Sequence, residues 1–148
     1  MSRPTLISLG YEGRSVGDLI GALSGNSVSV LVDVRLTPLS RKPGMSKRRL
    51  AEALRDAGIE YVHLPALGNP KDNRESFRNG DPVSWTRFRA QLTGNVATEA
   101  LDHLADLLSR EVVVAVLCFE RDHESCHRRM IAEAVREVRP SIELVTIS

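Results

Sequence analysis

Short apolar runs rich in β-branched residues alternate with amphipathic segments along the whole chain. These runs favour strands over residues 5–9, 29–35, 59–64, 112–119 and 142–147. Strands that alternate with helices form a parallel sheet covered by helices on both faces. We therefore expect a three-layer α/β/α fold, with a mostly parallel sheet of about five strands.

The segments between these runs carry the signals of helices. They predict helices over residues 16–23, 47–57, 83–92, 97–109 and 126–138, with an irregular connection over 65–82. Ser15 and Ser46 are placed to cap the first two helices, and Gly58 is placed to end the second. The run at 112–119 is apolar almost throughout, which predicts a central strand buried on both sides.

Length and composition favour a single domain over residues 1–148. No apolar run approaches the ~20 residues that cross a bilayer, so no membrane contact is expected. The N-terminus also lacks the apolar core of a signal peptide. We therefore expect a cytoplasmic protein whose two cysteines stay reduced rather than form a structural disulfide. The oligomeric state stays open.

Charge is distributed unevenly although its sum is small. The net charge of +1 argues against a general polyanion binder. Between Arg35 and Arg49, however, the chain carries six basic residues and no acidic residue. Such a cluster attracts phosphates and other anions, although a solvated basic loop has the same composition.

Residues suited to chemistry follow three of the predicted strands at one edge of the sheet. Ligands of open parallel sheets bind beyond the carboxyl ends of the strands, so this convergence predicts a site. The candidates are Gly10, Tyr11 and Glu12 after the first strand, Asp33 and Arg35 at the end of the second with Ser40 and Arg41 beyond it, and Cys118 at the end of the fourth with Glu120, Cys126, His127 and Arg128 beyond it.

The leading hypothesis is an enzyme that acts on a phosphate-bearing or other anionic substrate, such as a nucleotide or a nucleic-acid component. Arg35, Arg41 and Arg128 would hold the anion. Gly10 and Tyr11 belong to a glycine-flanked turn, "GYEGR", whose backbone N–H groups could add to anion binding.

Chemistry in this hypothesis depends on the cysteines. Cys118 or Cys126 would act as a nucleophile or a redox-active thiol, because a helix start and neighbouring arginines stabilise a thiolate. His127 would shuttle a proton, and Glu12 or Glu120 would serve as an acid or a base. Glu12 has an equal claim to be a simple capping carboxylate.

A zinc site is an alternative interpretation of the same segment. Cys118, His123, Cys126 and His127 give the spacing C-x4-H-x2-C-H, which is not that of a zinc finger or ribbon. Two adjacent residues on a helix, Cys126 and His127, have difficulty pointing at one ion. No metal and no cofactor are therefore predicted.

Structural interpretations stay open for the same residues. Asp33 near the end of a buried strand needs a partner, and an arginine on the same face would supply it. Glu120 and Arg128 could pair across their loop while His127 bonds a carbonyl, so that the strand–helix connection is locked. A further alternative is a non-catalytic module that binds nucleotide or nucleic acid through residues 35–49.

Four stretches resemble the uncharacterised family named domain of unknown function 488. They are "LGYEGRSVGDLI", "VLVDVRLTPLSRKPGMSKRRL", "GIEYVHLPALGNP" and "LCFERDHESCHRR", which together span nearly the whole chain. The resemblance implies a fold and a pocket but no settled reaction. Its pattern falls on the candidates named above and adds Pro38 and Gly68.

A fainter likeness is to rhodanese-like sulfurtransferases. They also carry Asp-x-Arg after an early strand and a cysteine after a later one, as "LVDVR" and "AVLCFE" do here. The loop "FERDHES" departs from that pattern because it has no glycine and contains three acidic residues, which repel a thiolate or persulfide.

Overall fold

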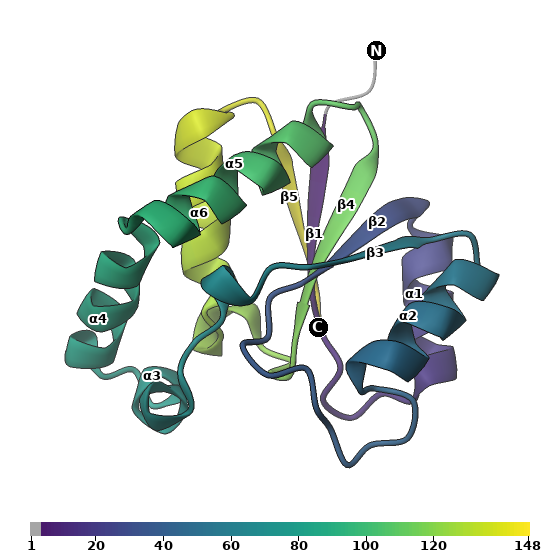
Figure 1. Ribbon diagram of the computed structural model, residues 1–148, viewed down its shortest axis with the longest axis horizontal. Helices are drawn as coiled ribbons and strands as arrows, with labels where there is room; N and C mark the ends of the chain where they lie inside the picture. The colour runs from purple at the N-terminus through teal and green to yellow at the C-terminus, as the bar shows by residue number, and fades with distance from the viewer. Residues whose placement is uncertain (1–3) are drawn as a thin grey trace.

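A computed structural model describes residues 4–148 of the chain, and it contains a five-stranded sheet that is parallel throughout. The spatial order is β3-β2-β4-β1-β5. The strands are β1 (Thr5–Gly10), β2 (Val28–Asp33), β3 (Glu60–His63), β4 (Val113–Cys118) and β5 (Glu143–Ile147). All five expected strands are present, and the run expected to be central is the middle strand (Figure 1).

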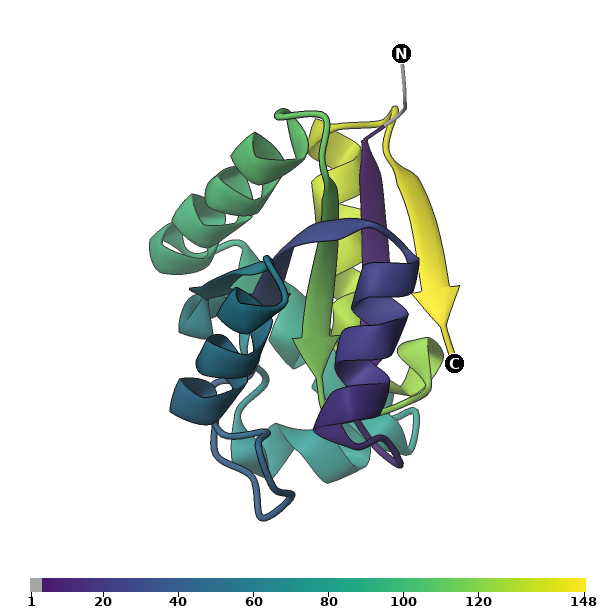
Figure 2. The ribbon, with the colours of Figure 1, turned by 90° about the vertical axis from the view of Figure 1, so that its right-hand side faces the viewer.

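Helices cover both faces of the sheet, which confirms the three-layer α/β/α fold. Helices α1 (Val16–Gly25) and α2 (Lys47–Asp56) lie together on one face (Figure 2). On the other side lie α3 (Arg74–Arg78), α4 (Pro82–Leu92), α5 (Asn95–Leu108) and α6 (Arg128–Val138) (Figure 1). None of the helices in residues 4–148 combines the length and apolar character needed to span a bilayer.

Two apolar cores lie on the two faces of the sheet, and β4 contributes to both. Ala115 and Leu117 pack with the α1 and α2 side chains, whereas Val114 and Val116 pack with those of α5 and α6. Successive side chains of a strand point to opposite faces, so a strand buried on both sides must be apolar at every position. Cys118 ends this strand within the larger core.

The helix caps follow the sequence signals in part. Ser15 forms a capping box with Asp18 at the start of α1, and Gly58 follows α2 with a φ of 78°. Ser46 makes no capping bond to α2. Its hydroxyl instead accepts from the Ser40 N–H and donates to the Ser40 carbonyl, so it closes the loop before the helix.

Two expected segments differ in the structure. The connection over 65–82 is not irregular, since it contains α3 and two 3₁₀ turns, Pro65–Leu67 and Lys71–Asn73. Helix α6 begins at Arg128 rather than Cys126, because Cys126 has the extended conformation φ −115°, ψ 149°.

Candidate functional site

The segments that follow β1, β2 and β4 meet at the carboxyl edge of the sheet. The Tyr11 and Glu12 N–H groups donate to the carbonyls of Cys118 and Phe119, at 3.1 and 2.9 Å. Beyond β2, the Val34 N–H donates to the Leu117 carbonyl at 3.0 Å. The predicted convergence of these segments is therefore present.

Close approach of backbone segments explains two glycines of the family pattern. A Cβ atom at Gly10 would overlap the backbone of Glu120 and Arg121. A Cβ atom at Gly68 would overlap the backbone of Leu36, 2.4 Å from its nitrogen, so that the connection after β3 could not lie against the segment after β2. Gly10 thus shapes the site by its missing side chain, and the structure gives it no direct contact with the cavity.

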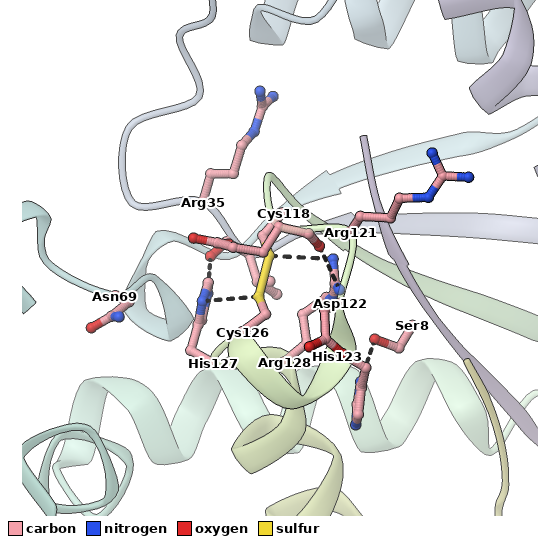
Figure 3. The surroundings of a disulfide bond; sticks show 12 residues. Ser8, Arg35, Asn69, Cys118, Arg121, Asp122, His123, Cys126, His127 and Arg128 are labelled. Atoms are coloured by element: carbon pink, nitrogen blue, oxygen red, sulfur yellow. Dashed lines mark hydrogen bonds between the residues drawn. A yellow bond between two sulfur atoms is a disulfide. The ribbon is translucent and has the colours of Figure 1, made fainter. Parts of the chain in front are cut away.

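The two cysteines lie together and are joined by a disulfide in the structure (Figure 3). Cys118 ends β4 and Cys126 lies two residues before the start of α6, and both are almost fully buried. Their connection turns back through the 3₁₀ turn His123–Ser125, which brings the second sulfur beneath the first. The expectation of two separate, reduced thiols is therefore wrong for this structure.

His127 is a buried, neutral imidazole with an assigned tautomer. Its Nε2 lies 2.9 Å from the Val34 carbonyl oxygen, and because a carbonyl only accepts, Nε2 carries the proton. Burial lowers the pKa of His127 to about 4, so the ring is uncharged near neutral pH. Nδ1 then holds a lone pair, and it faces the Cys126 sulfur at 3.5 Å (Figure 3).

Arg128 places a positive charge beneath the cysteines. It is fully buried, and it donates to the Cys118 sulfur at 3.3 Å (Figure 3). It also donates to the Glu120 carbonyl at 2.7 Å. Burial lowers the pKa of Arg128 to about 10, which leaves it protonated near neutral pH. Within residues 4–148 no carboxylate forms a salt bridge with Arg128, and its Nε has no hydrogen-bond partner.

A cavity of about 180 Å³ opens above Cys118. Pockets for drug-sized ligands measure roughly 300–1,000 Å³, so this one fits a small group. Its wall includes five of the candidate residues, which are Tyr11, Arg35, Cys118, Glu120 and His127.

Two arginines of α3 also line this cavity, and the sequence reasoning missed them. Arg74 donates from Nε to the Asn69 carbonyl at 3.0 Å, and Arg78 lies 3.8 Å from a Glu120 carboxylate oxygen. They are four residues apart on a segment that was expected to be irregular. A helical interpretation of "NRESFR" would have placed both arginines on one face.

Other candidate residues lie outside the cavity. Glu12 is exposed and accepts from the Arg121 N–H at 3.0 Å, in the loop after β4, while Ser15 caps α1. The Ser40 hydroxyl accepts from the Lys42 N–H, and Arg41 is exposed. Arg128 faces the sulfur rather than the cavity. The structure therefore does not bring Glu12, Ser40, Arg41 or Arg128 to an anion in this space.

Asp33 and Arg35 form a buried, bidentate ion pair, which is the structural interpretation of this motif. Arg35 donates to the two Asp33 carboxylate oxygens at 2.9 and 2.7 Å and to the Met45 carbonyl at 2.7 Å. Although burial alone would lower the pKa of Arg35, the charge and hydrogen bond of Asp33 raise it. The Tyr61 hydroxyl also donates to Asp33, at 2.6 Å, and burial together with this bond raises the Tyr61 pKa.

Four side chains near the cavity could together hold a metal ion. The ligand atoms of Cys118, Glu120, Cys126 and His127 all lie within 4.8 Å of one another. This set differs from the one considered from sequence, because His123 turns away to the Ser8 hydroxyl at 2.6 Å (Figure 3). The objection that two adjacent helical residues diverge also fails, since Cys126 is extended and precedes α6.

The chain was compared with known protein families, curated proteins and solved structures. Residues 15–135 match the family described as domain of unknown function DUF488, and the chain belongs to that family. No curated protein and no solved structure matches the chain. The likeness to rhodanese-like sulfurtransferases finds no support in these comparisons.

Proposed function

We propose that the protein is an enzyme that acts on a phosphate-bearing or other anionic substrate, such as a nucleotide or a nucleic-acid component. The observation that carries the proposal is the cavity in which Arg74 and Arg78 stand beside Cys118, Glu120 and His127. The cavity therefore combines arginines that can bind an anion with side chains that can act as a nucleophile, an acid or a base.

Two features of the cavity favour an anionic group as its occupant. Arginine guanidinium groups form strong, charge-assisted hydrogen bonds with phosphate and carboxylate oxygens. Arg74 has no salt-bridge partner within residues 4–148. Arg78 lies 3.8 Å from a Glu120 carboxylate oxygen, which is longer than the 2.7 Å of the Arg35–Asp33 pair. The volume of about 180 Å³ accommodates the anionic group itself, while the rest of a nucleotide would extend outside.

The chemistry of the proposal belongs to the cluster of Cys118, Glu120, Cys126 and His127. Glu120 Oε2 lies 3.3 Å from the Cys118 sulfur, within reach of a proton on the reduced thiol. The buried Arg128 charge stabilises an anionic sulfur at the same position.

The alternative of a nucleic-acid module built on residues 35–49 receives less support. Two of its cations serve the fold, because Arg35 pairs with Asp33 and Lys42 donates to the Tyr11 carbonyl at 2.9 Å. Arg48 is paired as well, with Glu52 at 3.6 Å.

Anion binding can be tested by calorimetry with inorganic phosphate and with a nucleoside monophosphate. Arg74→Gln and Arg78→Gln should each weaken binding by about 10- to 100-fold, since a hydrogen bond to a charged group contributes roughly 1.5–3 kcal/mol. Arg136→Gln, an exposed arginine on α6 outside the cavity, is the matched control and should leave binding unchanged. Equal losses in all three variants, or no binding by the native protein, would refute the anion site.

Catalysis is tested separately with a panel of phosphate esters and nucleotides under reducing conditions, followed by mass spectrometry. Cys118→Ser and Cys126→Ser should abolish turnover while circular dichroism shows an intact fold. Turnover that persists in both variants would exclude the cysteine cluster from the reaction, and turnover of none of the panel would count against an enzyme.

A further inference from the structure

The geometry points to a divalent metal site, suited to Zn²⁺, formed by Cys118, Cys126, His127 and Glu120 in the reduced protein. Thiolates and imidazole are the common zinc ligands, and a carboxylate completes many such sites. The use of the metal in catalysis rests on the function proposed above, whereas metal binding itself does not depend on it.

Two of the distances between ligand atoms match a tetrahedral site, whereas the two sulfurs, which are bonded to each other here, have to separate on reduction. With Zn–S near 2.3 Å and Zn–N or Zn–O near 2.0–2.1 Å, a sulfur and its neighbouring nitrogen or oxygen ligand stand about 3.5 Å apart. The Cys126 sulfur and His127 Nδ1 are 3.5 Å apart, and the Cys118 sulfur and Glu120 Oε2 are 3.3 Å apart. Two independent pairs therefore already have the separation that one shared ion requires.

The backbone spacing of the cysteines favours the same interpretation. Their Cα atoms lie 7.8 Å apart, whereas directly bonded cysteines usually span about 4.4–6.8 Å. Two sulfurs that bind one ion stand further apart than two sulfurs bonded to each other. The backbone therefore leaves room for the two sulfurs to move apart around an ion once the bond between them is reduced.

His127 is prepared as a ligand by its other nitrogen. Zinc-bound histidines usually donate their second ring N–H to a carbonyl or carboxylate, which fixes the tautomer and the ring orientation. The Nε2 proton of His127 is donated to the Val34 carbonyl, and its ring packs edge-on against Phe88 with centroids 5.2 Å apart. Nδ1 is thereby aimed at the Cys126 sulfur with a free lone pair.

Charge balance supplies a further reason. Two thiolates and the Glu120 carboxylate carry three negative charges in a largely buried space, where uncompensated charge is costly. The Arg128 guanidinium, in contact with the Cys118 sulfur, compensates one of them. A divalent cation compensates the other two, and the half-exposed Arg78, 3.8 Å from Glu120, adds a cation that solvent screens.

Glu120 differs from the other three ligands in its exposure. Its side chain is 12% exposed, lies on the cavity wall, and also faces Arg78. Catalytic zinc sites commonly have three protein ligands and one exchangeable position. Glu120 is the ligand that an oxygen of an anionic substrate can replace, which brings the metal and the Arg74–Arg78 pair to the same group.

Formation of the site requires reduction of the disulfide. A phosphine in water supplies the two electrons: the S–S bond breaks, two thiols form, and the phosphine becomes its oxide. Binding of Zn²⁺ then releases the two thiol protons to solvent. A phosphine is preferable to a dithiol for the experiment, because a dithiol competes for zinc.

The test is titration of Co²⁺, and then of Zn²⁺, into the reduced and chelator-treated full chain. One Co²⁺ should bind per chain with a thiolate-to-cobalt charge-transfer band and the visible bands of tetrahedral cobalt, and Zn²⁺ should displace it. Cys126→Ser and His127→Gln should weaken binding by more than about 100-fold, since even loss of a supporting partner costs 10- to 100-fold. Failure of the native protein to take up one Co²⁺ or Zn²⁺ would overturn the proposal.

His123→Gln is the matched control, because His123 belongs to the same loop but bonds to Ser8. It should bind cobalt as the native protein does, and a loss equal to that of His127→Gln would overturn the ligand assignment. Glu120→Gln should keep the thiolate band, change the visible bands, and bind more weakly by about tenfold. Retention of native visible bands would remove Glu120 from the set.

A measurement on the native protein covers the case in which a variant does not fold. Zn²⁺ should slow alkylation of both Cys118 and Cys126 in the reduced chain, as followed by mass spectrometry, and unchanged rates would refute the site. The Arg74→Gln variant separates the two proposals, because it should lose phosphate affinity and retain cobalt binding. Metal uptake without phosphate binding would leave the metal site standing and the anion site refuted.

Discussion

The segments after β2 and β4 lie side by side, and each contains a buried arginine with a different partner. Arg35, after β2, is held by both oxygens of Asp33, and Tyr61 donates to the same carboxylate. Arg128, after β4, contacts the Cys118 sulfur and a backbone carbonyl. The Arg35 charge is therefore neutralised by a carboxylate, whereas Arg128 faces a cysteine sulfur, whose charge depends on its oxidation state and on any ligand it binds.

This difference separates a motif that is paired within the fold from the one to which we assign chemistry in our proposal. A buried charge that is fully paired with a fixed carboxylate gains little from any further ligand. A buried charge beside a cysteine favours the anionic sulfur and therefore influences the chemistry of that sulfur. Both motifs stood out equally in the sequence, and Arg35 lines the cavity as Cys118, Glu120 and His127 do, but its guanidinium is already paired with Asp33.

The largest loss of stability is expected when the Asp33–Arg35 ion pair is broken. Asp33→Asn keeps the side-chain shape but leaves the Arg35 charge buried without a counter-charge, so the free energy of unfolding should fall by about 3–5 kcal/mol. Urea denaturation at neutral pH measures this change. A loss below about 1 kcal/mol would mean that the pair is not what holds this segment.

A smaller loss of stability is expected when Arg128, after β4, is replaced. Arg128→Met removes a buried charge that has no carboxylate partner and leaves the Glu120 carbonyl without its donor. The free energy of unfolding should therefore fall by about 1–3 kcal/mol. In reduced protein the same change should slow alkylation of Cys118, since the sulfur loses its neighbouring cation. A stability loss as large as that of Asp33→Asn would instead indicate that Arg128 locks the strand–helix connection.

The smallest effect is expected at the exposed carboxylate that links β1 to this loop. Glu12→Ala removes the acceptor of the Arg121 N–H, which water can replace, so the unfolding free energy should fall by no more than about 1 kcal/mol. Phosphate binding should stay within about twofold of the native value, as calorimetry would show. A large loss of phosphate binding would show that Glu12 belongs to the anion site.

Much of the fold could be predicted because it depends on local patterns. The apolar runs placed the five strands and the middle position of β4, and the capping box at Ser15 is the one that the sequence signal indicates. The exceptions lie where local signals compete with tertiary contacts. Ser46 has the sequence of a cap, but its hydroxyl is used by the loop at Ser40, and α3 was hidden by the turn-forming residues around it.

The candidate site could be predicted only in outline. Five candidates, Tyr11, Arg35, Cys118, Glu120 and His127, line the cavity, because parallel strands deliver their carboxyl ends to one edge. The sequence could not show that Arg74 and Arg78 join them, since α3 lies far along the chain. It also could not show that Cys126 and His127 converge, because this depends on where α6 begins.

By itself, the sequence determined the α/β/α architecture, the edge of the sheet at which the candidate residues converge and the segment that carries the cysteines. These follow from side-chain periodicity and from the geometry of parallel strands, which act within short stretches or apply to every such sheet. Only the tertiary structure decided which polar groups pair with each other and which face the cavity. Asp33 and Arg35 neutralise each other, whereas Cys118, Glu120, Cys126 and His127 are gathered beside the Arg128 charge, and that outcome depends on contacts between segments that no local pattern encodes.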